Sequence, residues 1–438
     1  MQPLNNIYTW SDISNKKKHL LLLRPMLHTN QEVQKTVKNI LNNIKYFGDT
    51  SLYKYTFLLD KQKIKKVQID TKKIQTSINA IKPDLKKSIL LAKSNIEKFH
   101  IEQKCQDIDI ETQKGIRCQK ITTPIDSIGL YIPGGDTPLI STVLMLSIPA
   151  YIAKCKNVYL CSPPPISKEV LYSAYVCGIK NIFQMGGAQA IGAFAFGTKQ
   201  VPKVNKIFGP GNSYVTEAKR QVRNSIPNLE IDMLAGPSEL MIIADEFANS
   251  DFVALDLLSQ AEHGPDSQVI LLSYSLVFVK NVIRKINQEI KKSLRKKILN
   301  RSIQNSRFII VKNIDEAINI SNLYAPEHLI LNILNPRSFL AKIKNAGSVF
   351  LGPWSPESVG DYSSGTNHVL PTYGSAIVNS GLGLSDFQKC ITVQELTPSG
   401  FLKIYNSVTV LSSYEKLEAH KNAMKCRFQS LTSGKNNV

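Results

Sequence analysis

The sequence predicts an α/β protein with two successive parallel sheets, each buried between helices. From near residue 121 onward, short apolar strands alternate with helical stretches, and most strands end at a turn marked by glycine or proline. The chain has 438 residues, which is too long for one ordinary hydrophobic core and favours two or more domains.

The elements follow in a clear order. Residues 1 to about 120 are rich in lysine and mostly helical by pattern, with helices expected near 31–47 and 84–99. The first series of strands is expected at 127–132, 157–161, 181–185 and 206–208. The second series is expected near 240–244, 268–273, 307–311, 328–333 and 347–351. From about residue 382, one or two strands precede a final helix at 414–428 that would carry both Glu415 and His420.

The composition excludes several classes of protein. The net charge of +20 comes from lysines and arginines spread along the chain with few aromatic residues among them, so nucleic-acid binding is not expected as the main function. Seven cysteines without a C-x-x-C pair indicate free thiols and a reducing compartment, which favours the cytoplasm. The longest apolar run, 139–153, is shorter than the ~20 residues of a membrane span and contains Ser147 and Pro149. We expect no membrane span and no signal peptide.

A helix ending near His263 is one candidate for a metal site. Ser250 is a plausible N-cap, and Gly264 and Pro265 would end the helix. An apolar stripe at helical spacing is formed by Ala254, Leu257, Leu258 and Ala261. Asp256, Gln260 and His263 would then share the opposite face, where an amide oxygen and an imidazole could form half of a metal site. The alternative is an ordinary amphipathic helix with a polar outer face.

Three glycine-bearing turns at strand ends in the first series are candidates for nucleotide binding. They lie at 131–135, 185–189 and 208–212. Ligands of open parallel sheets bind beyond the carboxyl ends of the strands, where small residues let the backbone approach a phosphate. The dinucleotide fingerprint G-x-G-x-x-G is absent, and each glycine could instead make only a tight turn.

Ionisable residues cluster in the second series. Glu327 and His328 lie at the mouth of an apolar strand, where one could activate water and the other could move protons. The segment 354–368 is rich in Gly, Ser and Pro and carries acidic residues and a histidine, as a binding loop would. Four of the seven histidines lie beside Gln, Glu, Asp or Asn: His263, His328, His368 and His420. Imidazole and carboxylate groups suit zinc, and the absence of H-E-x-x-H makes a metalloprotease unlikely.

Several motifs, in register over nearly the whole chain, resemble the histidinol dehydrogenase family. They are Leu-Arg-Pro at 23–25, Gly-Pro-Gly-Asn at 209–212, Ala-Gly-Pro-Ser-Glu at 235–239, Ser-Gln-Ala-Glu-His-Gly at 259–264, Tyr-Ala-Pro-Glu-His-Leu at 324–329, Gly-Asp-Tyr at 360–362, Gly-Thr-Asn-His at 365–368 and Glu-Ala-His at 418–420. No functional position departs from the family pattern. The resemblance implies oxidation of L-histidinol to L-histidine through the aldehyde, with two NAD⁺, in the last step of histidine synthesis.

The resemblance also implies roles for individual residues. Zinc would be bound by Gln260, His263 and Asp361, with His420 supplied by the second subunit of a homodimer. NAD would be contacted by Tyr131, Gln189 and Asn212. The amino alcohol would be contacted by Ser238, His368 and Glu415 together with the zinc ligands and His328. Glu327 and His328 would be the acid–base pair, with His328 accepting the alcohol proton and Glu327 activating water for the aldehyde step.

The fold implied by the resemblance is a pair of incomplete, doubly wound Rossmann-like α/β domains. The expected divisions are an N-terminal helical extension (1–26), a zinc and substrate domain (27–127 and 237–381), an NAD domain (128–236) and a C-terminal dimerisation segment (382–438).

Other functions remain open from the sequence. The same site could oxidise a different amino alcohol, or the chain could be a zinc hydrolase that needs no nucleotide. The aldehyde step could instead pass through a thiohemiacetal on Cys118 or Cys155, although both lie in apolar segments typical of core thiols.

Overall fold

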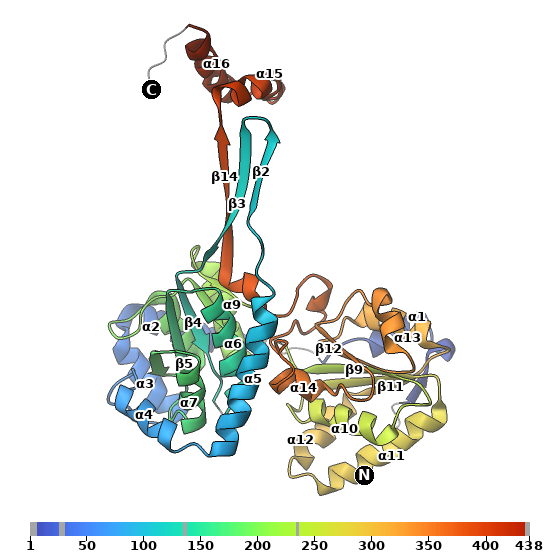
Figure 1. The fold of residues 1–438 in the computed structure, drawn as a ribbon. Helices are drawn as coiled ribbons and strands as arrows, with labels where there is room; N and C mark the ends of the chain where they lie inside the picture. The colour runs from blue at the N-terminus through green and yellow to red at the C-terminus, as the bar shows by residue number, and fades with distance from the viewer. Residues whose placement is uncertain (1–6, 26–30, 135–137, 234–235, 434–438) are drawn as a thin grey trace. The chain divides into compact units, whose positions relative to one another are not determined.

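The chain divides into two compact units (Figure 1). The computed structural model describes residues 7–25, 31–134, 138–233 and 236–433. The first unit comprises residues 1–103 and 125–387, and the second comprises 104–124 and 388–438.

The first sheet of the first unit has five parallel strands in the order β6-β5-β4-β7-β8. The strands are β4 (Ser127–Tyr131), β5 (Asn157–Ser162), β6 (Asn181–Gln184), β7 (Lys206–Phe208) and β8 (Glu230–Ile231). They are connected by helices α6 (Ile140–Ile152), α7 (Lys168–Val176), α8 (Gly187–Phe196) and α9 (Ser213–Ser225). The four strands predicted for this sheet are confirmed, and only the two-residue β8 was not foreseen. The winding reverses between β4 and β7, which makes the sheet doubly wound.

The second sheet has six parallel strands in the order β1-β11-β10-β9-β12-β13. The strands are β1 (Ile7–Thr9), β9 (Glu239–Ala244), β10 (Gln268–Ser273), β11 (Arg307–Ile310), β12 (His328–Asn332) and β13 (Ser348–Leu351). Its helices are α10 (Ser250–Ala261), α11 (Leu276–Lys292), α12 (Lys296–Gln304), α13 (Ile314–Tyr324) and α14 (Glu357–Tyr362). Every residue of β9, β10 and β12 is buried, as a strand covered by helices on both faces requires.

Without β1, the second sheet repeats the winding of the first, so the predicted pair of doubly wound α/β sheets is confirmed. β1 is a correction to the helical N-terminal segment. It precedes a short 3-10 helix η1 (Trp10–Asp12) and α1 (Asn15–Leu21), and it adds an edge strand beside β11. A three-residue edge strand has too little periodicity to be recognised from sequence.

The helices that precede the first sheet pack against that sheet. They are α2 (Gln31–Phe47), α3 (Asp49–Asp60), α4 (Thr71–Asn79) and α5 (Pro83–Ile101). The buried stripe of α2 is formed by Val37, Ile40, Leu41 and Ile44, which share a core with residues of β6, α8 and α9. The domain division expected from the resemblance placed residues 27–127 with the second series of strands. An apolar stripe shows which face of a helix is buried but not which sheet covers it, and here it is the first.

The second unit contains a three-stranded antiparallel sheet and two helices. The strand order is β14-β3-β2, with β2 (Ile108–Gln113), β3 (Ile116–Pro124) and β14 (Gln388–Leu396). The helices are α15 (Pro398–Tyr414) and α16 (Glu418–Thr432). The prediction of one helix over 414–428 is therefore wrong. Lys416 adopts a left-handed conformation with φ of 59°, which separates Glu415, the C-cap of α15, from His420 in the first turn of α16.

No described helix has the length and apolar character needed to cross a membrane. The long apolar run noted in the sequence becomes α6, whose residues from Thr142 to Ala150 are buried in the first unit and which contains Pro149. Shorter 3-10 segments complete the fold: η2 (Pro336–Lys342), η3 (Ser375–Ile377) and η4 (Leu384–Phe387).

Candidate active site

A cavity of about 890 Å³ in the first unit is lined by residues from both of its sheets. The five-stranded sheet contributes the turns that follow β4, β7 and β8, namely Pro133, the segment 209–212, and Asp232 with Met233. These turns are at the carboxyl ends of the strands, where ligands of open α/β sheets bind. The turn at 208–212, where the sequence predicts nucleotide binding, thus lines the cavity through residues 209–212.

The six-stranded sheet presents the opposite ends of its strands to the same cavity. Ser238 precedes β9, Glu327 precedes β12, and His328 is the first residue of β12. The ionisable groups therefore enter at the amino ends of these strands. Sequence reasoning located the groups but did not show that two sheets meet in this way.

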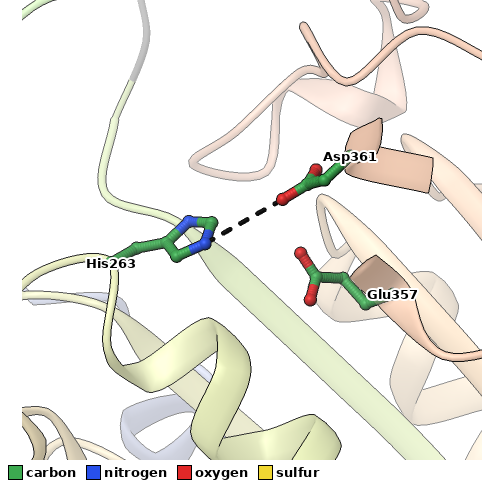
Figure 2. Close-up of side chains that lie close together, drawn as sticks. All are labelled: His263, Glu357 and Asp361. Atoms are coloured by element: carbon green, nitrogen blue, oxygen red, sulfur yellow. Dashed lines mark ion pairs between the residues drawn. The ribbon is translucent and has the colours of Figure 1, made fainter. Parts of the chain in front are cut away.

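Three side chains, one from the turn after α10 and two from α14, form a compact cluster at the cavity (Figure 2). The cluster consists of His263, Glu357 and Asp361, which can present one ligand atom each within 4.8 Å of one another. His263 Nε2 lies 3.9 Å from Asp361 Oδ2. Glu357 and Asp361 are four residues apart on α14, so their carboxylates share one face of the helix. Such a donor set can hold a divalent cation.

Gln260 supplies a fourth oxygen beside this cluster. Its side chain is fully buried, and its Oε1 atom has no hydrogen-bond partner in the structure. Its Nε2 lies 3.4 Å from His263 Nδ1. Glu357 is also buried; its Oε2 accepts a hydrogen bond of 2.9 Å from Ser259 Oγ, whereas its Oε1 has no partner. A buried oxygen without a donor is costly unless a ligand or ion satisfies it, so both oxygens mark this as a binding site.

The environment of α10 corrects part of the sequence interpretation. Asn249, not Ser250, is the N-cap, because its Oδ1 accepts from the backbone N–H groups of Asp251 and Phe252. The face with Asp256 and Gln260 is not an exposed polar face, since α10 packs against α11, α12 and α14. Burial raises the pKa of Asp256 to about 7. His263 lies in the turn after the helix and is about two-fifths exposed.

Glu327 and His328 are both held by the backbone of Glu239 at the start of β9. Glu327 Oε2 accepts a hydrogen bond of 2.8 Å from Glu239 N, and His328 Nδ1 lies 3.1 Å from Glu239 O. A carbonyl oxygen only accepts, so His328 Nδ1 must carry a proton. Nε2 is therefore the nitrogen of His328 that can gain or lose a proton, and it lies 4.0 Å from Asp361 Oδ1.

The charge state of His328 depends on its carboxylate neighbours. Burial by itself would lower the pKa of His328, but Glu327, Glu357 and Asp361 outweigh it and raise the pKa to about 9. Burial, and next the charge of Asp361, raise the pKa of Glu357 to about 8. The acidic groups are thus crowded enough that a proton is retained among them, a state that a bound cation would relieve.

His368 and Ser238 complete the lining near Asp361. His368 Nδ1 donates to the Asp361 backbone carbonyl at 3.0 Å, and burial lowers the pKa of His368. Its Nδ1 is 4.0 Å from Asp361 Oδ1. Ser238 Oγ lies 3.4 Å from His263 Nδ1. Three histidines from three segments therefore surround the carboxylate of Asp361.

The residues expected to contact a nucleotide differ in their access to the cavity. Asn212 lines it and also caps α9 by accepting from the N–H groups of Tyr214 and Val215. Tyr131 and Gln189 are buried and do not line it. Tyr131 Oη accepts from Gly187 N at 3.2 Å. Gln189 Nε2 donates to Asp60 Oδ2 at 3.3 Å, and its Oε1 has no partner.

The glycines of these turns are also required for packing. Gly209 has a φ of 117°, and a Cβ there would lie 2.0 Å from the Tyr131 carbonyl oxygen. A Cβ on Gly134 or Gly186 would collide with the ring of Pro163. Tight packing therefore accounts for these glycines even without a bound ligand. The backbone at 209–212 still lines the cavity and can contact a ligand there.

The structure thus brings most of the expected site residues to one cavity. The expected residues that line this cavity are Asn212, Ser238, Gln260, His263, Glu327, His328, Asp361 and His368. Glu415 and His420 belong to the second unit. Sequence reasoning did not single out Glu357, although its spacing of four from Asp361 on a short helix was a usable signal.

A carboxylate–imidazole cluster in a cavity lined by two doubly wound α/β sheets defines an enzyme site suited to acid–base chemistry and to a bound divalent cation. The chain is a member of the histidinol dehydrogenase family, whose model matches residues 24–428. It therefore has an oxidoreductase role in histidine biosynthesis.

Relatives of this family match almost the whole chain. The histidinol dehydrogenase of Buchnera aphidicola subsp. Acyrthosiphon pisum is 55% identical over 431 residues, covering 98% of this chain and 99% of the relative. That of Escherichia coli K12 is 49% identical over 427 residues, covering 98% of each chain. The crystal structure of the enzyme from Elizabethkingia anophelis is 44% identical with a TM-score of 0.95, covering 99% of this chain and 100% of that one.

Proposed function

We propose that this enzyme oxidises L-histidinol through L-histidinaldehyde to L-histidine and passes a hydride to NAD⁺ in each of two steps. The observation that carries the proposal is the cluster around Asp361, where three imidazoles lie within 4.0 Å of the carboxylate. A buried amide oxygen without a partner lies beside it.

Zinc fits this cluster better than an ion that prefers only oxygen, because the donors combine imidazole, carboxylate and amide groups. The proposed ligands are Gln260, His263 and Asp361, with His420 of the partner subunit completing the set. The buried and unpaired Gln260 Oε1 supports this assignment. Bound zinc would orient the imidazole and amine of the substrate and offset the negative charge of the carboxylates around His328.

In the first step, His328 Nε2 accepts the proton of the substrate hydroxyl. The hydride leaves the carbinol carbon for NAD⁺ as the carbonyl double bond forms. His328 Nδ1 keeps its proton throughout, because Glu239 O holds it. The imidazole can therefore exchange a proton on one side only, which is the side that lines the cavity.

In the second step, Glu327 removes a proton from water, and the resulting hydroxide adds to the aldehyde carbon. His328 Nε2 returns the proton taken from the alcohol to the carbonyl oxygen, which gives the hydrate and leaves His328 Nε2 free to accept again. His328 Nε2 then accepts the hydroxyl proton of the hydrate while its hydride leaves for a second NAD⁺, which yields the carboxylic acid. Glu327 is buried and fixed by Glu239 N, so it can reach water only within the cavity that it lines.

The remaining site residues have proposed roles in binding. Ser238, His368 and Glu415 would contact the amino alcohol. Asn212 would contact NAD at the cavity wall. Tyr131 and Gln189 would do so only after a local rearrangement, and the unpaired Oε1 of Gln189 is an acceptor that such a change could expose.

A cysteine nucleophile for the aldehyde step is disfavoured by the structure. Burial raises the pKa of Cys155 to about 11, which leaves little thiolate near neutral pH. Cys118 lies on β3 in the second unit. A hydrated aldehyde with Glu327 as base needs neither thiol.

The proposed assembly is a homodimer in which each site takes residues from both subunits. The second unit exposes many large apolar side chains, a pattern typical of an interface. They include Ile108, Ile110, Ile391, Leu396, Leu402, Val410, Leu411, Tyr414 and Leu417. A second copy of the chain is the proposed partner. The seven cysteines are free, which supports a cytoplasmic location.

The direct test is turnover of L-histidinol with NAD⁺, followed by absorbance at 340 nm, before and after treatment with a chelator. We expect two NADH per histidinol, loss of activity without metal, and recovery when zinc is added. The same assay with other amino alcohols tests specificity. Absence of NADH formation from histidinol by the zinc-loaded protein would refute the proposal.

A further inference from the structure

A buried ion pair joins the N-terminal segment to the start of β9. Arg24 donates from Nε to Glu239 Oε1 at 2.5 Å and from a terminal nitrogen to Glu239 Oε2 at 2.9 Å. The two side chains are 12% and 2% exposed. This bidentate geometry is the strongest form of an Arg–carboxylate contact. Neither residue lines the cavity, so neither is placed to contact a substrate bound there.

The backbone of Glu239 holds both members of the acid–base pair. Its N–H donates to Glu327 Oε2 at 2.8 Å, and its C=O accepts from His328 Nδ1 at 3.1 Å. Any shift of the Glu239 backbone would therefore move both Glu327, which activates water, and His328, which accepts protons.

Arg24 also holds the chain that leads into Glu327. The same terminal nitrogen donates to the carbonyl oxygens of Tyr324 at 2.7 Å and Ala325 at 3.2 Å. The guanidinium lies 3.9 Å from the centre of the Tyr324 ring. Ala325 has a φ of 52°, an unfavourable left-handed conformation for a non-glycine residue that requires external support.

A third contact connects this pair to the segment between α14 and η3. Tyr373 N donates to Glu239 Oε1 at 2.9 Å. The Glu239 carboxylate is therefore bonded by Arg24 on both oxygens and by a backbone amide. One guanidinium and one carboxylate thus join three segments that meet behind Glu327 and His328.

We propose that Arg24 and Glu239 are positioning residues for the reaction, which fix Glu327 and His328 through the Glu239 backbone and the turn at 324–325. The inference rests on the proposed function for the roles of the acid–base pair. Arg24 and Glu239 make no contact with the reacting atoms; they set the direction of His328 Nε2 and the reach of Glu327.

The primary test is Glu239→Gln in the zinc-loaded enzyme. The substitution leaves the backbone N–H and C=O in place but puts an amide donor against the donors of Arg24. We expect kcat to fall tenfold or more for both the alcohol and the aldehyde step. KM for histidinol and the zinc bound per chain should change less than twofold, because neither residue lines the cavity.

A second readout does not depend on activity. In protein labelled with ¹⁵N-histidine, the His328 Nδ1 proton should give a slowly exchanging, downfield resonance, assigned by its loss in His328→Gln. We expect Glu239→Gln to shift or broaden this resonance. Wild-type kcat with an unchanged resonance would overturn the proposal, as would a fall in kcat without any change in the resonance.

Two further variants keep the test decisive. Arg24→Lys retains the charge but not the bidentate contact, so it should show a smaller loss in the same direction, and it replaces Glu239→Gln if that chain does not fold. Glu217→Gln breaks a matched bidentate pair with Arg220 on α9 and should leave both readouts unchanged. If the wild type fails to oxidise histidinol, the proposed function fails, but the His328 resonance still decides whether the ion pair orients the imidazole.

Discussion

At the scale of single residues, Glu327 and His328 divide the proposed chemistry between them. We expect His328→Asn to lower both oxidations by about 10²–10⁴-fold, the usual contribution of a positioned acid–base group. The asparagine amide can still donate to Glu239 O, so the variant removes Nε2 and keeps that hydrogen bond. Glu327→Gln should slow mainly the aldehyde step, since only that step requires activated water. Single-turnover kinetics on histidinol and on histidinaldehyde separate the two, and aldehyde oxidation at the wild-type rate in Glu327→Gln would exclude the proposed role of Glu327.

Glu357 gives a second prediction at this scale. Its pKa rises to about 8 in the folded chain from 4.5 in a free side chain, because of burial and the charge of Asp361. Between these values the folded state holds a proton that the unfolded state has lost, so Glu357 makes the free energy of unfolding fall as pH rises from about 4.5 to 8. Each pKa unit corresponds to about 1.4 kcal/mol.

We therefore expect Glu357→Gln, in chelator-treated protein, to remove part of this fall and to be more stable than the wild type above pH 8. Thermal unfolding between pH 5 and 9 measures the difference. Glu289→Gln is the control, because Glu289 is only partly buried on α11 and its hydrogen bond with Lys292 lowers its pKa, the opposite direction to Glu357. Equal pH dependence in wild type and Glu357→Gln would show that Glu357 keeps no proton in the folded state.

Some residues of the site could be predicted from the sequence, and others could not. His263, His328 and His368 could be proposed because histidine is rare in the chain and each lies beside an amide or acidic residue. Arg24 and Glu239 carry no such signal: charged residues are common, and only the fold shows that this pair is buried behind the acid–base residues.

At the scale of helices and strands, α10 determines where Gln260 and His263 lie. Its N-terminal amides are capped by Asn249, which is exposed and does not line the cavity. We expect Asn249→Ala to lower the free energy of unfolding by about 1 kcal/mol. Asn249→Asp retains the capping oxygen and should remain near the wild type. Denaturant titration measures both, and equal stabilities for the alanine and aspartate variants would show that the cap contributes nothing.

The strands could be predicted where burial leaves a simple pattern. β9, β10 and β12 are apolar throughout because helices cover both of their faces. The second unit offered no such pattern, since all six residues of β2 are exposed. The helix predicted over 414–428 failed for a different reason: no glycine or proline in this segment marks a break, but the backbone at Lys416 is left-handed.

At the scale of the whole molecule, the position of the cavity depends on how the two large sheets of the first unit meet. The cavity lies in the first unit and is lined by the carboxyl ends of one sheet and the amino ends of the other. Sequence patterns show the order of strands along the chain but not which ends of two different sheets meet. The residues at 415 and 420 belong to the second unit, and their proposed role depends on assembly of two chains.

Shared sites make a specific prediction for mixed dimers. A chain with His263→Ala has a defective first unit but an intact His420, and a chain with His420→Ala has the reverse. If His420 acts in the partner subunit, each heterodimer has one intact site, so an equal mixture that is dissociated and reassembled should recover about a quarter of wild-type activity by statistical pairing. The control is a mixture of His263→Ala and Asp361→Ala, in which both changes lie in the first unit and no pairing restores a site. Recovery of NADH production only in the first mixture supports sharing. If His420 acted within its own chain, neither mixture could recover, because every site would carry one of the two substitutions.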